Sequence, residues 1–454
     1  MACSRFGRFA AAAALGLAVL ATSGRVEAQQ LAGVYVDAEG VLHKRVFNDP
    51  HGQLMKQRAS AARASLAHHV ASPSKLRKIS LTRLEHAIVE GHQQGRQITP
   101  EMLNLAGLTR LTHVFFYPDS GDVVIAGPAE GWVKDLSGRT RGLESGRPVL
   151  ELQDMVVALR MFPPGGEHTV IGCSIDPTEE GLARMQAFLR QIGGRATPAD
   201  TQSIVDGLRT SLGLQKVRIL GVPPDTHFAQ VMVEADYRMK LIGIGLERPP
   251  IKMASYVDRA TPSSVSRNAL QRWYFTPDYE CVRVTDDELA MQLVGEGVRL
   301  VGAHELVQGN GSRVRTHSVD RASQAFTHTF TAKYPQLAAK SPVYAQLRNL
   351  IDMSIAAAFI QQQDYYGKAD WTMSFFGDEA NFPVETYHAP REVGTVVASR
   401  WKGHQLMTPV GGGVNIQAWQ ALEPEKRLAD DDGKLRETRR EVKIKLKNGQ
   451  WWWD

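Results

Sequence analysis

The chain has 454 residues, of which 43% are hydrophobic and 22% are charged, and its formal net charge is +5. This composition excludes an intrinsically disordered chain, and three cysteines in so long a chain exclude a small disulfide scaffold. The length is sufficient for about two or three globular domains.

The first residues have the pattern of an export signal. Arg5 and Arg8 supply a positive start, residues 10–20 form an apolar run too short to span a bilayer, and residues 26–28 form a small-x-small cleavage site. No cysteine follows the apolar run, so we expect no lipid anchor. We expect cleavage before Gln29, export to the periplasm or the extracellular space, and no transmembrane segment after removal of the signal. The alternative is that these residues remain as an uncleaved anchor.

The mature chain would carry little net charge. Removal of residues 1–28 takes three Arg and one Glu from the 53 basic and 48 acidic residues, which leaves 426 residues and a net charge of +3. No mature segment is a dense basic run, so we expect no nucleic-acid partner. Cys173 and Cys281 then remain, both in apolar, strand-like sequence. Two separate buried thiols and one disulfide are both compatible with this pattern.

The N-terminal region, residues 29–146, has mixed helix and strand signals. The expected elements are a hairpin over 34–46 with its turn at 37–40, helices over 55–69 and 81–95, strands over 111–117 and 123–126, and a loop over 132–146. Ser80 precedes the second helix at the position of an N-cap.

The central region, residues 147–307, is predicted to be a compact α+β domain. Its expected elements are a helix over 149–162, a strand over 169–175, a helix that opens at 176–180 and ends at 193, a helix over 198–212, a strand over 216–222, the stretch 225–247, and strands over 270–277, 281–285 and 290–307.

The stretch 225–247 lies near the middle of the chain and fits two structures. As a helix, it would begin at a cap at Asp225 or Thr226 and end at Gly243. One stripe of this helix would be apolar and would contain Phe228, Val231, Met232, Ala235, Met239, Ile242 and Leu246. The opposite side also carries large apolar residues, so such a helix would be covered on two sides.

The spacing of the charged residues in this stretch is compatible with both a helix and a strand. Glu234 precedes Arg238 by four residues and Asp236 precedes Lys240 by four, which is the favourable order for ion pairs on a helix. The same residues alternate with apolar ones, as in a strand. Length and charge order favour the helix, and the strand remains the alternative.

The pattern changes after a polar linker at residues 308–320. The next region, 321–421, is expected to hold a helical pair over 321–333 and 341–363 and a hairpin over 383–416 with turns at 402–403 and 411–413. Ser341 is expected to cap the second helix. The complete pattern predicts a multi-domain α+β protein, with mixed small sheets, packed helices and a C-terminal part made of this helical pair and β-hairpin.

The last region, residues 422–454, is predicted to be a charged linker over 422–440 followed by a terminal hairpin over 441–453, with its turn at Asn448-Gly449. Three consecutive Trp residues, 451–453, are expected to cap a small sheet. The alternative is a sugar-binding platform, which would need its rings exposed on one face.

Familiar catalytic and cofactor motifs are missing from the sequence. There is no His-Glu-x-x-His, no Gly-x-Ser-x-Gly, no Gly-x-x-x-x-Gly-Lys and no Cys-x-x-Cys, so we expect no metal and no cofactor. Glu234, Asp236 and His227 are the candidates for acid–base chemistry. The two carboxylates would lie about 7 Å apart on one face of a strand, but would point about 160° apart on a helix. A structural charge cluster is the favoured interpretation.

Three segments resemble a family of exported bacterial proteins that is known only as a domain of unknown function. They are Ala-Asp-Tyr-Arg-Met-Lys-Leu-Ile-Gly-Ile-Gly-Leu-Glu (235–247), Trp273-Tyr274-Phe275-x-Pro277, and Ser-Pro-Val-Tyr-Ala-Gln-Leu-Arg-Asn-Leu (341–350). The resemblance covers roughly residues 200–420. The family has no assigned catalytic residues, so the resemblance implies export and no particular activity.

Two functional hypotheses are compatible with these observations. The first is a non-catalytic binding or structural protein of the bacterial cell envelope, with an envelope protein or polymer as its partner. The second is a hydrolase of envelope polymers that uses Glu234 and Asp236 as paired carboxylates. A buried, ion-paired segment would support the first, and an open cleft holding both carboxylates without cationic partners would support the second.

Overall fold

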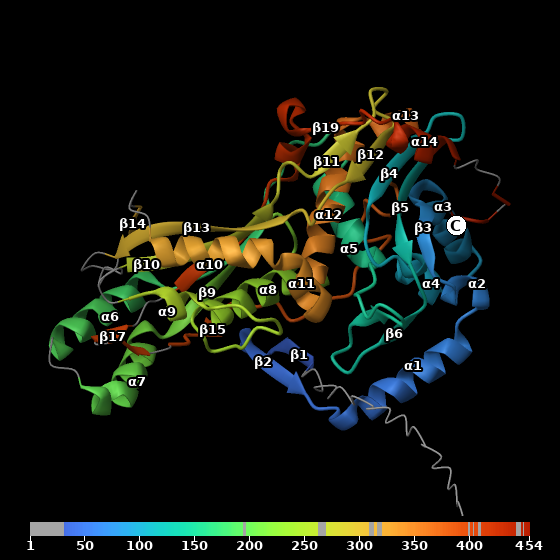
Figure 1. The fold of residues 1–454 in the computed structure, drawn as a ribbon. Coiled ribbons are helices and arrows are strands. Elements are labelled where there is room, and N and C mark those ends of the chain that lie inside the picture. The colour runs from blue at the N-terminus through green and yellow to red at the C-terminus, as the bar shows by residue number, and fades with distance from the viewer. Residues whose placement is uncertain are drawn as a thin grey trace, which may run out of the picture.

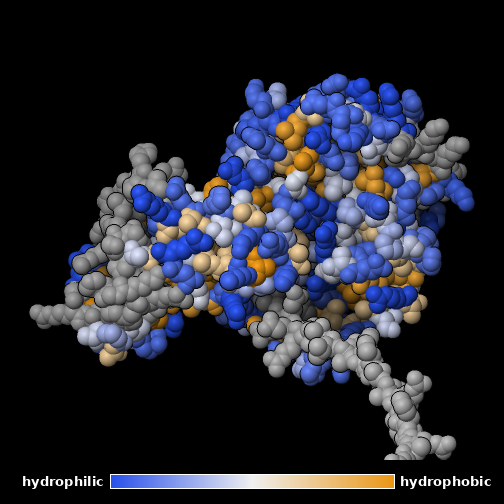
Figure 2. Space-filling model, viewed as in Figure 1, coloured by the Kyte–Doolittle hydropathy of each residue, from blue (hydrophilic) through white to orange (hydrophobic). Residues whose placement is uncertain are grey.

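The computed structural model describes residues 31–193, 197–261, 269–307, 313–315, 320–397, 400–402, 404–406, 410–441, 446–447 and 449–454 (Figure 1). It combines two large sheets with packed helices, so the predicted α+β class is confirmed. Among the described residues, no helix has both the length and the apolar character needed to cross a membrane. The face shown in Figure 2 is mainly hydrophilic, with its hydrophobic side chains in small separate patches.

The larger sheet joins nine strands from distant parts of the chain. In spatial order they are β1 (Leu31–Val36), β2 (Val41–Phe47), β15 (Glu392–Gly394), β9 (Leu214–Leu220), β8 (Ile171–Asp176), β18 (Val410–Ile416), β10 (Ala269–Pro277), β13 (Val298–Val307) and β14 (Arg313–Arg315). The pairs β2–β15 and β10–β18 are parallel, and the other neighbours are antiparallel.

The second sheet has seven strands. Their order is β19 (Leu428–Ala429), β11 (Val282–Val284), β12 (Ala290–Leu293), β4 (His113–Tyr117), β5 (Asp122–Ala129), β3 (Ser74–Ser80) and β20 (Trp452–Trp453). Side chains alternate between its faces, so Phe116 lies in the main core and Phe115 packs with Leu435 on the other face. The sheet is therefore covered on both sides.

Two short hairpins hold the remaining strands of the described residues. They are β6 (Trp132–Lys134) with β7 (Thr140–Gly142), and β16 (Arg400–Lys402) with β17 (His404–Leu406). The prediction of a loop over 132–146 is therefore wrong in part. The Asp135 carboxylate accepts hydrogen bonds from the backbone N–H groups of Ser137 and Arg139, and these bonds close the β6–β7 turn.

The longer helices of the described residues fall near the predicted positions, whereas α4, α9, α11, α13 and α14 were not predicted, and α14 lies largely within the predicted charged linker 422–440. They are α1 (Gln53–Ser65), α2 (His68–Ala71), α3 (Leu81–Gln93), α4 (Pro100–Leu103), α5 (Leu152–Met161), α6 (Glu179–Ile192), α7 (Thr201–Leu212), α8 (His227–Gly243), α9 (Tyr256–Arg259), α10 (Arg321–Ala332), α11 (Tyr334–Lys340), α12 (Pro342–Gln362), α13 (Tyr365–Lys368) and α14 (Lys434–Glu441). Short 3-10 turns lie at η1 (Pro50–Gly52), η2 (Leu105–Gly107), η3 (Pro198–Asp200), η4 (Ala418–Leu422) and η5 (Pro424–Lys426).

The stretch 225–247 forms helix α8, as favoured from its length and charge order. The Thr226 hydroxyl accepts a hydrogen bond from the Ala229 N–H at 3.2 Å, and the helix ends at Gly243. Every residue from 231 to 244 is buried. The helix packs on β8 and β18 of the large sheet and on α5 and α12 from the other side, so its apolar residues are covered all round.

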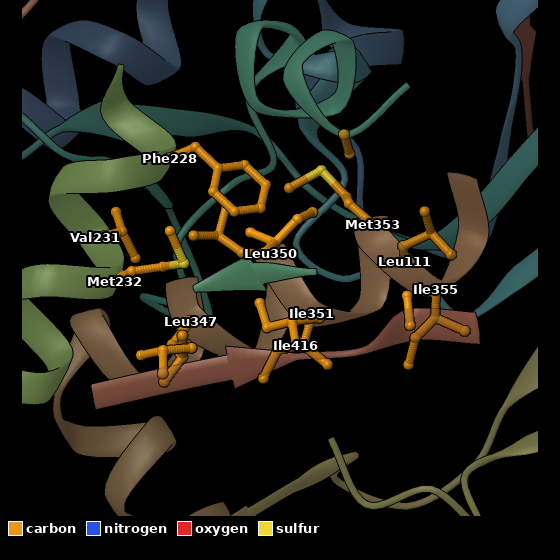
Figure 3. Packing of buried hydrophobic residues seen from close by; sticks show 14 of the residues in the cluster. Leu111, Phe228, Val231, Met232, Leu347, Leu350, Ile351, Met353, Ile355 and Ile416 are labelled. Carbon is orange, nitrogen blue, oxygen red and sulfur yellow. The ribbon is translucent and has the colours of Figure 1, made fainter. Parts of the chain in front are cut away.

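Helix α12 is the main partner of α8 outside the sheet, and residues 343–360 of it are all buried. Figure 3 shows apolar side chains of the two helices directed toward one another, with strand β18 alongside. The labelled residues of α8 are Phe228, Val231 and Met232, and those of α12 nearest to them are Leu347, Leu350 and Ile351. Ser341 precedes α12, but its hydroxyl makes no capping bond, so that predicted cap is wrong.

Residues 411–413 were predicted to form a turn, and this is wrong because they lie inside strand β18. A Cβ atom added to Gly412 would collide with the backbone of Trp273, and one added to Gly413 would collide with that of Cys173. Glycine therefore lets β18 lie between β8 and β10, where any side chain on these residues would meet a neighbouring strand.

The predicted domain boundaries stay a prediction. Each of the two large sheets contains strands from several of the predicted domains. Within the predicted linker 308–320, residues 313–315 form β14, and residues 308–312 and 316–319 lie outside the described part. Residues 442–445 and 448 of the predicted terminal hairpin also lie outside it. The end of the chain, β20, pairs with β3 of the second sheet.

Candidate functional site

The two carboxylates proposed from the sequence lie on one helix and face different surroundings. Successive residues of an α-helix are separated by about 100° around its axis, so Glu234 and Asp236 point to nearly opposite sides. The Asp236 carboxylate faces the large sheet, and the Glu234 carboxylate faces the β6–β7 turn. Both are buried. They therefore do not form a pair that could act on one substrate.

Asp236 is enclosed by the sheet and by its own helix. Its Oδ2 accepts a hydrogen bond from Lys240 Nζ at 2.7 Å, and that ammonium also donates to the carbonyl oxygens of Ile175 and Gly412 at 2.8 and 3.1 Å. Burial raises the pKa of Asp236 to about 6, although the Lys240 charge opposes the rise. The arrangement joins α8 to β8 and β18 and leaves no room for a substrate.

Glu234 belongs to a chain of alternating charges. It pairs with Arg238 at 3.3 Å and with the guanidinium of Arg139 from the β6–β7 turn. Arg238 also pairs with Glu247 at 2.9 Å, and Glu247 pairs with Lys44 of β2 at 2.6 Å. The predicted i,i+4 pair is thus present within a larger network that joins α8 to β2 and to the β6–β7 turn.

An open cleft of about 760 Å³ borders this network. Its lining includes charged, amide, hydroxyl and aromatic side chains as well as aliphatic ones. The residues that carry these polar and aromatic groups are Phe47, Asn104, Lys134, Ser137, Arg139, Thr140, Glu151, Gln153, His227, Gln230, Glu234, Phe382, Glu385 and Tyr387. The wall is assembled from β1, β2, the β6–β7 hairpin, the start of α5, the start of α8 and the segment 382–387.

His227, the first residue of α8, lies at this cleft beside two acids. Its Nδ1 is hydrogen-bonded to Asp154 Oδ2 at 2.8 Å, and Glu151 lies close by. Burial lowers the pKa of His227, but the carboxylates of Asp154 and Glu151 more than offset this effect and raise the pKa to about 9. The other ring nitrogen lies 3.4 Å from the amide nitrogen of Gln346, whose oxygen accepts a hydrogen bond from Arg139 at 2.8 Å.

Comparison with known protein families finds a match to part of this chain. Residues 173–256 match the family model described as Protein of unknown function (DUF1598). A DUF1598 domain is thus found in this chain. The expected resemblance to a domain of unknown function is confirmed, although the matched range runs from 173 to 256 and leaves out the segments at 273–277 and 341–350. No curated protein and no solved structure matches the chain.

The DUF1598 domain extends from β8 to the first residue of α9, and helix α8 is its longest helix. Of the three candidates named from the sequence, His227 and Glu234 line the cleft, whereas Asp236 does not. The acids Glu151 and Asp154, at the start of α5, precede the domain, and Gln346 of α12 follows it. The cleft is therefore lined both by residues of the domain and by residues of the segments that pack around it.

The residues outside the DUF1598 domain that contribute to the site were not identified from the sequence. Glu151 and Asp154 are three apart at the start of a predicted helix, a spacing that puts both on one face and was the one available signal. Nothing local connects them to His227 or connects Arg139 to Glu234. Cys173, inside the domain, and Cys281, outside it, are separate buried thiols. Burial raises the pKa of Cys281 to about 12, so this thiol stays protonated at neutral pH.

Proposed function

We propose that this chain is an exported, non-catalytic binding protein of the bacterial cell envelope and that the cleft beside α8 is its binding site. Two features support the proposal: the export-signal pattern of residues 1–28 and the open cleft with mixed polar and aromatic lining. An envelope polymer offers hydroxyl, amide and carboxylate groups together with apolar faces. Such a ligand suits amide side chains, ionised side chains and aromatic rings in one cleft.

The observation that carries the proposal is the ion pairing of the acidic residues at and behind the cleft. The Glu234 carboxylate lies between the guanidinium groups of Arg139 and Arg238. A general acid must release and regain a proton during turnover, and a carboxylate held by two permanent cations is badly prepared for this. Binding needs no such exchange, because fixed charges and hydrogen-bonding groups hold a ligand in one orientation.

The alternative, a hydrolase of envelope polymers that uses Glu234 and Asp236, receives less support from the geometry. Paired-carboxylate hydrolysis needs both groups on the two sides of one scissile bond, about 5–9.5 Å apart and open to the substrate. Here the two side chains leave opposite sides of α8, and Asp236 is 0% exposed. A cationic partner holds each of them.

The binding proposal can be tested with soluble peptidoglycan fragments as the probe. Calorimetric titration of the purified protein should show saturable binding, and Tyr387→Ala should abolish it because this ring lies at the cleft, 6.0 Å from the His227 ring. Tyr279→Ala is the matched control, since Tyr279 is also half-buried but lies outside the cleft lining. Release of new fragments by the wild type, lost in both Glu234→Gln and Asp236→Asn, would favour the hydrolase instead.

Export is tested separately, by mass spectrometry of the mature N-terminus. Expression in a bacterial host should yield protein in the periplasmic or culture fraction that begins at Gln29, because residues 26–28 carry the cleavage pattern. Intact chain that begins at Met1 in the membrane fraction would show that the signal stays as an anchor. Ala28→Arg replaces the small residue directly before the cleavage site with a large charged one, and it should block cleavage at this position.

A further inference from the structure

The cluster of Glu151, Asp154 and His227 has a second property that the binding proposal does not use. Helix α5 brings the two acids, since Glu151 directly precedes it and Asp154 lies in its first turn, while His227 is the first residue of α8. One ligand atom from each of the three residues lies within 4.8 Å of the other two. Two helix starts thus place two carboxylates and one imidazole around a single point.

The Asp154 carboxylate has an oxygen that no group of the protein satisfies. Its Oδ2 is bonded to His227, but its Oδ1 is buried without a hydrogen-bond partner among the described residues, and Asp154 is only 4% exposed. A buried carboxylate oxygen left in this condition destabilises the folded state, because it has lost its water and gained no partner. A cation held at the cluster would satisfy this oxygen.

We propose that Glu151, Asp154 and His227 bind one divalent cation of the zinc class at the wall of the cleft. Zinc accepts imidazole nitrogen and carboxylate oxygen together, at about 2.0–2.2 Å, whereas calcium and magnesium take oxygen ligands. Two carboxylates balance the charge of one divalent ion. The ion would take the place of the proton that His227 Nδ1 shares with Asp154 Oδ2, and that proton would pass to solvent through the cleft, because zinc binds the neutral imidazole.

The position of the cluster leaves part of the coordination sphere to the cleft. Glu151 and His227 line the cleft, whereas Asp154 lies behind them. Three protein ligands leave a fourth position of a tetrahedral ion open to water or to a ligand group. Arg139, on the same wall, is engaged by Glu234 and Gln346. The metal site does not depend on the proposed function, because its ligands would hold the ion whether or not a polymer enters the cleft.

The test uses purified protein without a polyhistidine tag, stripped with a chelator and titrated with Zn²⁺ in a calorimeter. We expect one zinc ion per wild-type chain. Asp154→Asn and His227→Gln should each weaken binding by about 100-fold or more, because even the loss of an outer-shell partner weakens metal sites by about 10–100-fold. His86→Gln is the control: this exposed histidine lies 3.7 Å from Glu90 on α3, and its loss should leave the binding unchanged.

A second variant and a spectroscopic probe keep the test decisive if a buried substitution prevents folding. Glu151→Gln changes a residue at the open end of the cluster, and circular dichroism will show whether each variant keeps its helices. Co²⁺ added to the stripped wild type should develop visible absorption that Glu151→Gln weakens. Absence of stoichiometric zinc in the wild type, or equal affinity in the wild type and all three cluster variants, would overturn the site.

Discussion

At the scale of single residues, the charges inside α8 show how burial changes the effect of an ion pair. Lys240 and Asp236 are 4% and 0% exposed, and the pair is 2.7 Å long. Removal of the lysine would leave a buried carboxylate without its cation. Lys240→Met should therefore lower the free energy of unfolding at pH 7 by about 3–5 kcal/mol. Urea unfolding of variant and wild type measures the difference.

The same variant should depend on pH in a definite direction. Burial already raises the pKa of Asp236 from the unfolded value of 3.8 to about 6. A carboxyl group with a raised pKa destabilises the folded state as pH rises from its unfolded pKa of 3.8 to its folded pKa of about 6, and the protonated form carries no such penalty. The loss caused by Lys240→Met should be smaller at pH 5 than at pH 7; equal losses would contradict the explanation. Lys434→Met, in an exposed pair with Asp432, should have no measurable effect at either pH.

At the scale of elements, strand β18 depends on its glycines. Gly413 lies against the backbone of Cys173 in β8, and an added methyl group has nowhere to go. Gly413→Ala should destabilise the protein by about 1–3 kcal/mol or more, the range for overpacked interiors. Gly394→Ala in β15 is the matched control in the same sheet, because nothing lies within 4 Å of its added Cβ. Thermal unfolding of both variants checks the prediction, and a similar response from the two would refute it.

At the scale of the whole molecule, the C-terminal residues hold the edge of the second sheet. Strand β20 pairs with β3, and the Asp454 carboxylate pairs at 2.8 Å with Arg77, a side chain that is 0% exposed. The Arg77 guanidinium also lies 4.5 Å from the Trp452 ring and donates to four backbone carbonyls. Trp452 is thus engaged in packing, but at the edge of a seven-stranded sheet and not on the small sheet that was predicted.

Deletion of residues 451–454 should lower the midpoint of thermal unfolding, because it removes the pairing of β20 with β3, the Trp452 ring beside the Arg77 guanidinium and the Asp454 carboxylate. The carboxylate itself is half exposed, so solvent screens its pair with Arg77. Asp454→Asn keeps the tryptophans and should show a smaller loss. A truncated protein that melts like the wild type would show that β20 contributes nothing to stability. Glycan binding abolished by Trp452→Ala, without a change in melting, would instead favour a sugar platform.

The sequence by itself determined the features that depend on neighbours within a few residues. The cap and the i,i+4 pairs of α8 join groups at most four residues apart, so their spacing predicts them once the stretch is taken as a helix. The sequence left the cap open between Asp225 and Thr226, and the structure assigns it to Thr226. The same holds for the Ser80 cap of α3 and for the α+β class. The cap at Ser341 failed because its hydroxyl, although at the right position, is buried without a bond.

Only the tertiary structure decided the features that join distant segments. The His227–Asp154 bond spans 73 residues and the Arg139–Glu234 pair spans 95, so no local pattern could connect them. The glycines of β18 look like a turn in sequence, because both a turn and a close strand contact require the absence of a side chain. The cleft, its ion pairs and the strand order follow from how the chain is brought together, since each depends on which surfaces meet after the helices and strands have formed.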